Sequence, residues 1–221
     1  MPYRSEIIAP FEHYHIFNRG VRKEDIFLRK EDYIRMLFLI LHLQAPIPFR
    51  NIGRFVGAYK RKHRFIAQTI INEIIENREV ELCSFSLMPN HFHLLVYELK
   101  ENGISSYLQR VQIAYAKYFN KKYKKSGYLF QGRFGSVHIE SNQQLAYVSA
   151  YIHLNSRELS LWKNREELYP WSSYQDVIGE NRWGFLLKPN VYFEQFGSKK
   201  DYKIFVKTSG AKDLNSSSGF L

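Results

Sequence analysis

The sequence predicts an α+β fold in which helices cover one face of an antiparallel sheet. Segments with the two-residue alternation of strands are interleaved with segments of helical periodicity, and two β-rich runs, 79–87 and 91–99, lie almost end to end. Met88-Pro89-Asn90 joins these runs and carries the Pro and Asn that are typical of a tight turn. We therefore expect a β-hairpin in the middle of the chain.

The other elements are predicted in chain order. Alternation indicates the first strand, which ends at the turn signal Arg19-Gly20, and the first helix has apolar residues at helical spacing up to the region of Pro46. An apolar stripe that ends in lysines before Gly127 predicts a long helix, and Ser141-Asn142 is a start signal for the last helix. The expected strands cover residues 13–18 and 134–140, and the expected helices cover residues 32–43, 65–76, 104–121 and 143–154.

A length of 221 residues and a hydrophobic content of 45% fit one domain with extensions. We expect the main domain at residues 1–165, with a helical insertion at about 45–78 that contains the basic cluster 60–64. Residues 166–206 are expected to pack on this domain, since Trp, Tyr and Phe recur there. The run Ser216-Ser217-Ser218-Gly219 predicts a disordered tail over 207–221.

The net charge of +11 is spread along the chain, which favours a polyanionic partner and nucleic acid above all. Aromatic residues make up 16% of the chain, and rings interleaved with Lys and Arg suit the stacking of unpaired bases. Cys83 is the single cysteine, which excludes a disulfide framework and a cysteine-based zinc site and fits a cytoplasmic protein. No apolar run reaches membrane-spanning length, and the amino terminus lacks a secretory layout, so no membrane partner is expected.

His91-Phe92-His93 is the pattern that indicates chemistry. Residues two apart in a strand leave the same face, so both imidazoles are available to one metal ion while Phe92 points the other way. The pattern alone is a weak signal, because zinc enzymes also contain it. A zinc hydrolase would need a further ligand, and the sequence has no His-Glu-x-x-His helix to supply one.

The residues around this pair resemble the signature of the single-tyrosine HUH transposases, and in particular the REP-associated tyrosine transposase group. The resemblance covers roughly residues 10–180 and consists of four segments in family order. In chain order, these segments are His13-Tyr14-His15-Ile16-Phe17-Asn18-Arg19-Gly20, Ser86-Leu87-Met88-Pro89-Asn90-His91-Phe92-His93-Leu94-Leu95-Val96, Leu129-Phe130-Gln131-Gly132-Arg133-Phe134 and Tyr151-Ile152-His153-Leu154-Asn155.

The resemblance implies a ferredoxin-like antiparallel sheet of the HUH endonuclease type, with Mg²⁺ or Mn²⁺ held by His91, His93 and a polar side chain that matches Asn155. It also implies that Tyr151 attacks single-stranded or hairpin DNA, forms a 5′-phosphotyrosine and allows a free 3′-hydroxyl to reseal the strand. Independently, Asn155 follows Tyr151 by four residues and would share its helical face. Tyr147, one turn earlier, is the alternative nucleophile.

Several side chains are candidate DNA contacts, of which Arg133 has support from the resemblance and the lysines have only their charge. His15 and His138 either line the site or are ordinary, partly buried histidines, and we favour the ordinary interpretation for both. The candidates are Arg19, Lys60, Arg61, Lys62, Arg64, Lys117, Lys121, Gln131 and Arg133.

Two points depart from the family pattern, and two questions stay open. Asn155 is followed by Ser156 where the family usually has Pro, and the insertion is longer than the resemblance implies. The sequence does not choose between a monomer and a homodimer. The alternative function is a non-catalytic, domesticated DNA- or RNA-binding module of the same fold.

Overall fold

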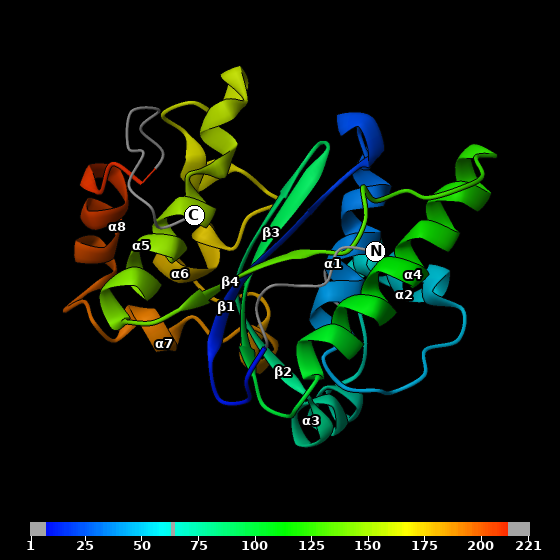
Figure 1. The fold of residues 1–221 in the computed structure, drawn as a ribbon, viewed down its shortest axis with the longest axis horizontal. Helices are drawn as coiled ribbons and strands as arrows, with labels where there is room; N and C mark the ends of the chain where they lie inside the picture. Colours follow the sequence, from blue (N-terminus) through cyan, green and yellow to red (C-terminus); the bar gives the residue numbers. More distant parts are fainter. Residues whose placement is uncertain (1–7, 63–64, 212–221) are drawn as a thin grey trace.

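The computed structural model describes residues 8–62 and 65–211 (Figure 1). Four strands form one antiparallel sheet in the order β2-β3-β1-β4, and the elements follow one another along the chain as predicted. The strands are β1 (His13–Arg19), β2 (Val80–Met88), β3 (His91–Glu98) and β4 (Gly135–Ile139); the helices are α1 (Lys30–His42), α2 (Ile52–Lys62), α3 (Gln68–Asn77), α4 (Gly103–Tyr123), α5 (Asn142–His153), α6 (Tyr174–Ile178), α7 (Asn190–Phe193) and α8 (Lys199–Thr208).

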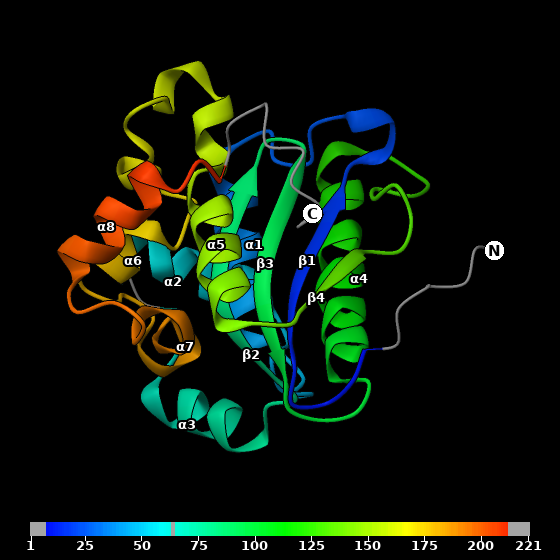
Figure 2. The ribbon, with the colours of Figure 1, turned by 60° about the vertical axis from the view of Figure 1, so that its left-hand side comes forward.

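Helices lie on both faces of this sheet, as the ribbon shows from two sides (Figures 1 and 2). The α+β antiparallel fold is confirmed, but the expectation that the helices lie on one face is wrong. Helices α1 and α4 cover one face, and a second layer of α5, α6, α7 and α8 covers the other. The reason can be seen in β3, where Leu94 and Val96 pack toward α1 and α4 while Leu95 packs toward α5. A strand that is apolar on both sides needs cover on both sides.

The insertion is a folded part of the α1 face. It contains α2 and α3. Phe49, Phe55 and Phe65 surround Phe38 of α1, with ring centroids 5.3, 5.4 and 5.5 Å from the ring of Phe38. These contacts give the insertion a place in the main hydrophobic core.

Buried Asp32 joins the start of α1 to the end of α4. Its carboxylate accepts hydrogen bonds from Lys122 Nζ at 2.6 Å, from the Tyr123 hydroxyl at 2.7 Å and from the Tyr118 hydroxyl at 2.9 Å. Burial alone would raise the pKa of the Asp32 carboxyl, but these hydrogen bonds outweigh it and leave the pKa below its ordinary value. Lys122 thus serves the fold at the end of the lysine-rich helix.

Replacing Asp32 by Asn is expected to lower the free energy of unfolding by about 3 kcal/mol, because Lys122 loses its buried partner. Urea titration would measure this loss. Since the carboxyl has a lowered pKa in the folded state, its contribution is complete above the ordinary pKa of 3.8 and disappears as the pH falls through the folded value. The difference between wild type and variant should therefore shrink in acid. Glu24→Gln, which removes an exposed partner of Lys125, should cost less than about 1 kcal/mol.

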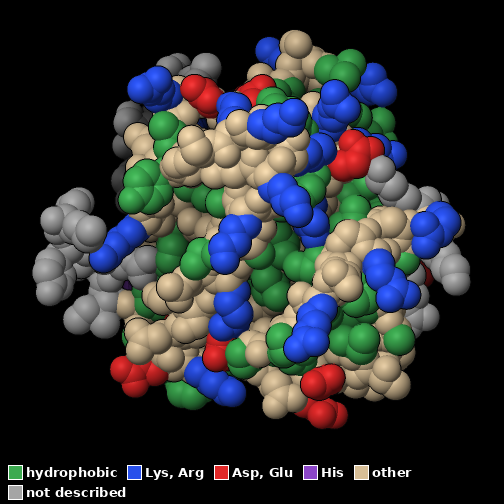
Figure 3. All heavy atoms as spheres, turned by 90° about the vertical axis from the view of Figure 1, so that its right-hand side faces the viewer, with side chains coloured by type: hydrophobic (Ala, Val, Ile, Leu, Met, Phe, Trp, Pro, Cys, Tyr) green, Lys and Arg blue, Asp and Glu red, His purple; other side chains and the backbone are tan. Residues whose placement is uncertain are grey.

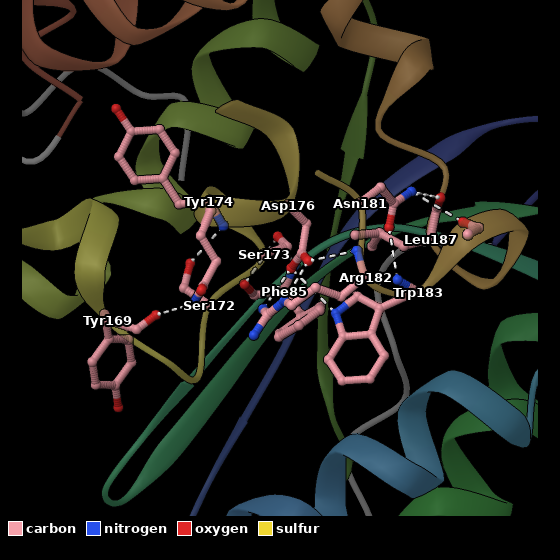
Figure 4. Close-up of polar contacts among 12 residues, drawn as sticks. Phe85, Tyr169, Ser172, Ser173, Tyr174, Asp176, Asn181, Arg182, Trp183 and Leu187 are labelled. Atoms are coloured by element: carbon pink, nitrogen blue, oxygen red, sulfur yellow. Dashed lines mark hydrogen bonds and ion pairs between the residues drawn. The ribbon is translucent and has the colours of Figure 1, made fainter. Parts of the chain in front are cut away.

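The segment after α5 runs back along the edge of the sheet. Residues 171–173 join β2 through a bridge between Ser86 and Ser172, a hydrogen bond from Leu87 N to Trp171 O at 2.9 Å and one from Ser173 N to Phe85 O at 3.0 Å. Figure 4 shows this contact and the neighbouring Asp176 carboxylate, which binds the Arg182 guanidinium. The edge strand is thereby covered by the chain itself. Helix α8 continues to Thr208, two residues into the stretch predicted as a tail, and residues 212–221 of that tail lie outside the described residues.

Candidate active site

A pocket of about 340 Å³ opens where β1 ends and β3 begins. It brings together five of the side chains singled out in the sequence, which come from segments far apart in the chain: Arg19, His91, His93, Gln131 and Tyr151. The other lining residues are His15, Phe17, Asn18 and Glu158.

Strand alternation and register place the histidine pair in this pocket. His91 and His93 leave the α5 face of β3, while Phe92 is fully buried in the core on the opposite face. In the antiparallel pairing with β1, His93 lies opposite Phe17 and His91 lies opposite Arg19. The same pairing therefore brings Arg19 to the histidines.

Each histidine is held through its Nδ1 atom. His91 Nδ1 lies 2.6 Å from Asn90 Oδ1, and His93 Nδ1 lies 2.9 Å from His15 Nε2. Metal-binding histidines are commonly oriented in this way, with one ring nitrogen bonded to a partner and the other directed at the ion. In both rings Nε2 is then the nitrogen that would bind a metal.

His15 is a site residue that the sequence analysis missed. It is buried, lines the pocket and stacks on His93 with ring centroids 5.0 Å apart. The interpretation as an ordinary histidine is wrong for His15, because the register of β1 against β3 puts it diagonally beside His93. The alternation of β1 indicated its face, but nothing in the sequence indicated the register. His138 is partly exposed and lies 3.2 Å from Glu12, outside the pocket.

Tyr151 reaches the histidines from α5. Its ring centroid lies 5.5 Å from that of His93 and 5.7 Å from that of His15, with the rings nearly perpendicular to each other. Tyr147 is not among the described residues that line the pocket. The geometry thus places Tyr151, and not the residue one turn earlier, next to the histidine pair.

The carboxyl end of α5 is fixed from two sides. His153 is fully buried between Ser173 Oγ at 3.0 Å and the Tyr202 hydroxyl at 2.7 Å, which ties α5 to the edge segment and to α8. Burial lowers the pKa of His153 to about 3, so this histidine is neutral at ordinary pH. Tyr151 lies two residues before His153 on the same helix, so these two hydrogen bonds also fix the position of Tyr151.

Asn155 does not lie where the helical spacing predicted. Helix α5 ends at His153, and Asn155 begins a short 3₁₀ turn in which its Nδ2 donates to the backbone oxygen of Tyr151 at 3.1 Å. The side chain is fully buried and is not one of the residues lining the pocket, whereas Glu158 is. The expectation that Asn155 shares the helical face of Tyr151 is wrong, because the α-helix ends at His153 and Asn155 belongs to the 3₁₀ turn that follows.

The donor atoms around the pocket fit a divalent cation of the Mg²⁺ or Mn²⁺ class. Within residues 8–62 and 65–211, no three His, Cys, Asp or Glu side chains are grouped to hold a metal, so a third protein ligand would have to be of another type. Asn155 Oδ1 is buried and has no hydrogen-bond partner among the described residues. An acceptor left in this state costs about 1–3 kcal/mol, which metal binding would offset. The two imidazoles of the pocket leave positions for phosphate oxygens, and Asn155 would join this set only if its amide, which is outside the pocket in this structure, turned toward them.

The loop before β4 forms the rim of the pocket. Gln131 N donates to Arg19 O at 2.8 Å, and Asn18 Nδ2 donates to Gly132 O at 3.1 Å. At the start of β4, a side chain on Gly135 would come within 2.5 Å of the Phe17 ring, so the glycine makes room for a pocket residue. These contacts explain why Gln131 and Phe17 meet in the pocket.

Four of the remaining predicted DNA contacts, Arg61, Lys117, Lys121 and Arg133, are not among the residues that line the pocket. Figure 3 shows the side that carries α4 and α2, over which Lys and Arg side chains are spread while acidic ones lie mainly near its margins. Lys117, Lys121, Arg61 and Arg133 are exposed; Lys60 and Lys62 belong to α2 but their side chains are not described, and Arg64 lies outside the described residues.

No helix in the described part of the chain is long and apolar enough to span a membrane.

Comparisons with known proteins match this arrangement. Residues 55–155 fit the family model of IS200-like transposases, a range that includes His91, His93 and Tyr151. Over these residues the chain is similar to the IS200-like transposases. The resemblance inferred from the motifs is thereby confirmed, and it supports a transposase-like function on DNA. No curated protein matches the chain.

A solved structure is similar to this chain in fold. It is described as a REP-associated tyrosine transposase bound to a REP hairpin, and it superposes with a TM-score of 0.50. The match covers 80% of this chain and 85% of that chain at 16% sequence identity. At this identity the likeness concerns the fold.

Proposed function

We propose that this protein is a metal-dependent single-strand DNA endonuclease and strand transferase that acts through a 5′-phosphotyrosine. The observation that carries the proposal is the meeting of Tyr151 with His91 and His93 in one pocket that is open to solvent. A phenol ionises near pH 10, so attack on a phosphodiester at neutral pH needs help from its surroundings. A bound Mg²⁺ or Mn²⁺ would polarise the scissile phosphate.

Each pocket residue has a role in the proposed reaction. The Tyr151 oxygen attacks the phosphorus, a tyrosine O–P bond forms, and the bond from phosphorus to the 3′ oxygen breaks and leaves a 3′-hydroxyl. His91 and His93 would hold the cation through Nε2, and Arg19 and Gln131 at the rim would bind backbone phosphates or bases. The phosphotyrosine keeps the energy of the broken bond, so a 3′-hydroxyl can reseal it without a nucleotide cofactor.

The substrate class follows from the related fold and from the charge. The matched structure is of a protein bound to a REP hairpin, and a chain with a net charge of +11 attracts DNA in general. We therefore propose that cleavage takes place in single-stranded DNA at or near a hairpin.

The proposal can be tested with end-labelled hairpin oligonucleotides that carry single-stranded flanks, incubated with the protein and Mn²⁺ and separated on denaturing gels. A protein-linked DNA band that requires the metal is expected. Metal-independent binding without any covalent band, over a library of hairpins and flanks, would instead identify a non-catalytic binding module.

Glu158 is the one carboxylate among the described residues that line the pocket, and we assign it as acceptor of the phenol proton. Glu158→Gln is expected to lower the rate of adduct formation about a hundredfold, since proton transfer to a positioned group typically contributes at least that factor. Raising the pH should recover part of the lost rate, because hydroxide then replaces the missing base. Single-turnover rates over a pH series would measure both effects. Glu140→Gln, at an exposed carboxylate just after β4, serves as the control, and an equal loss there would refute the role of Glu158.

A further inference from the structure

A second cavity lies beside the hairpin turn that precedes His91. Its volume is about 530 Å³, and its walls include the aromatic residues Phe27, Tyr33 and Trp171 together with Pro89, Pro170 and Arg29. Pro89 belongs to the β2–β3 turn, and the backbone of residues 26 and 27 is fastened to it by two hydrogen bonds to Pro89 O, at 2.9 and 3.0 Å. The cavity is lined by Pro89 and the active-site pocket by His91, two residues later, so one end of the β2–β3 hairpin contributes to both.

The aromatic rings of this cavity form an ordered stack. Tyr33 lies between Phe27 and Trp171, with centroids 4.6 Å from each and interplanar angles of 25° and 17°. Trp171 closes the stack and is only partly buried. Flat rings at this spacing present a face on which a further planar group can stack.

The stack is held in place before any ligand arrives. Trp171 belongs to the segment that pairs with the edge of β2, where its backbone oxygen accepts from Leu87 N at 2.9 Å (Figure 4 shows the adjoining contacts of Ser172 and Ser173). Tyr169, two residues earlier, donates its hydroxyl to Leu87 O at 2.6 Å. A preformed aromatic wall costs little conformational entropy when it binds a ligand.

The charges around the cavity favour an anionic ligand. Arg29 and Lys30 are both exposed at its edge, against a single carboxylate, Asp25. Aromatic faces combined with cations are the usual means by which proteins bind single-stranded nucleic acids, since the rings stack on bases and the cations follow the phosphates. A cavity of this size admits one nucleotide but no duplex, and a base within a duplex has both faces already covered by its neighbours.

We propose that this cavity binds an unpaired base of the DNA strand whose phosphodiester lies in the active-site pocket. The inference rests on the proposed function for the identity of the strand. A strand that crosses the β2–β3 turn would meet Trp171 and Arg29 on one side and His91 and Tyr151 on the other. The stacked base would fix the register of the strand relative to the attacking phenol.

The test compares binding of two probes to protein that carries Tyr151→Phe, so that no cleavage interferes. One probe is an oligothymidylate of about 16 nucleotides, and the other is an abasic oligomer of the same length. The oligothymidylate is expected to bind about tenfold more tightly, because a stacked base typically contributes about this factor or more. Adding Trp171→Ala should remove most of the difference, while Trp171→Phe should keep it. Phe185→Ala, at an exposed ring beside α3, should change nothing.

Two further measurements keep the result interpretable. Arg29→Gln changes an exposed side chain and should weaken binding of both probes equally, whatever the stability of the Trp171 variants. An oligothymidylate that carries 5-iodouracil should photocrosslink to a peptide that contains Tyr33 or Trp171. Crosslinks confined to other peptides, or an unchanged preference for bases in Trp171→Ala, would overturn the inference. Because this assay needs no cleavage, absence of the Tyr151 adduct would refute the proposed function and leave the base site standing.

Discussion

Tyr151→Phe is expected to abolish the covalent protein–DNA product, with a fall in the cleavage rate of about a thousandfold or more, as is typical when a nucleophile is removed. The phenyl ring fills the same space beside His93 and His15, so DNA and metal binding should be retained. The change therefore separates chemistry from binding. Denaturing gels report the adduct, and fluorescence anisotropy with the same oligonucleotide reports the binding.

Tyr147→Phe is the matched control, since it removes the same hydroxyl group one helical turn away and outside the pocket. Its adduct yield should stay within about twofold of wild type, in line with ordinary surface substitutions. The opposite pattern, with activity lost in Tyr147→Phe and kept in Tyr151→Phe, would require the nucleophile to be reassigned.

The second large effect concerns the metal. His93→Ala, alone or together with His91→Ala, is expected to eliminate detectable Mn²⁺ binding and with it cleavage. His15→Phe should leave both ligands in place but weaken Mn²⁺ binding about 10- to 100-fold, since the partner that orients His93 is lost. Titration of the protein followed by Mn²⁺ electron paramagnetic resonance measures affinity without any DNA.

Two variants make this prediction specific. His15→Gln keeps an acceptor for the Nδ1 proton of His93 and should recover part of the Mn²⁺ affinity. His138→Gln replaces a histidine that is bound to Glu12 outside the pocket and should have no effect. If His15→Phe bound Mn²⁺ as well as wild type does, His15 would be a packing residue only.

Much of the fold could be predicted because its determinants are local. The alternation of β3 and the Met88-Pro89-Asn90 turn predicted the hairpin. Helical stripes predicted α1, α4 and α5 close to their observed bounds. The second helical layer could not be predicted, because the run Leu94-Leu95-Val96 shows that β3 is apolar on both faces but does not show which segment covers which face. That assignment depends on contacts between segments far apart in the chain.

The same distinction applies to the candidate site. His91, His93 and Tyr151 were identified from their motifs, and the structure brings them together. His15 was misjudged because its importance comes from strand register, and Asn155 was misplaced because a helix end at His153 is set by tertiary contacts with Ser173 and Tyr202. Glu158 carried no signal, since a glutamate in an irregular segment is common on any protein surface.

The anchoring of α5 has a consequence for complementation between two mutant copies of the gene. Tyr151 is supplied to His91 and His93 by a helix of the same polypeptide, and His153 binds that helix to α8 of the same polypeptide. If the proposed function holds, one chain of this structure would supply both the nucleophile and the metal-binding histidines. In a cell that holds one gene copy with a damaged tyrosine and another with damaged histidines, two products that each work alone would then fail to complement each other.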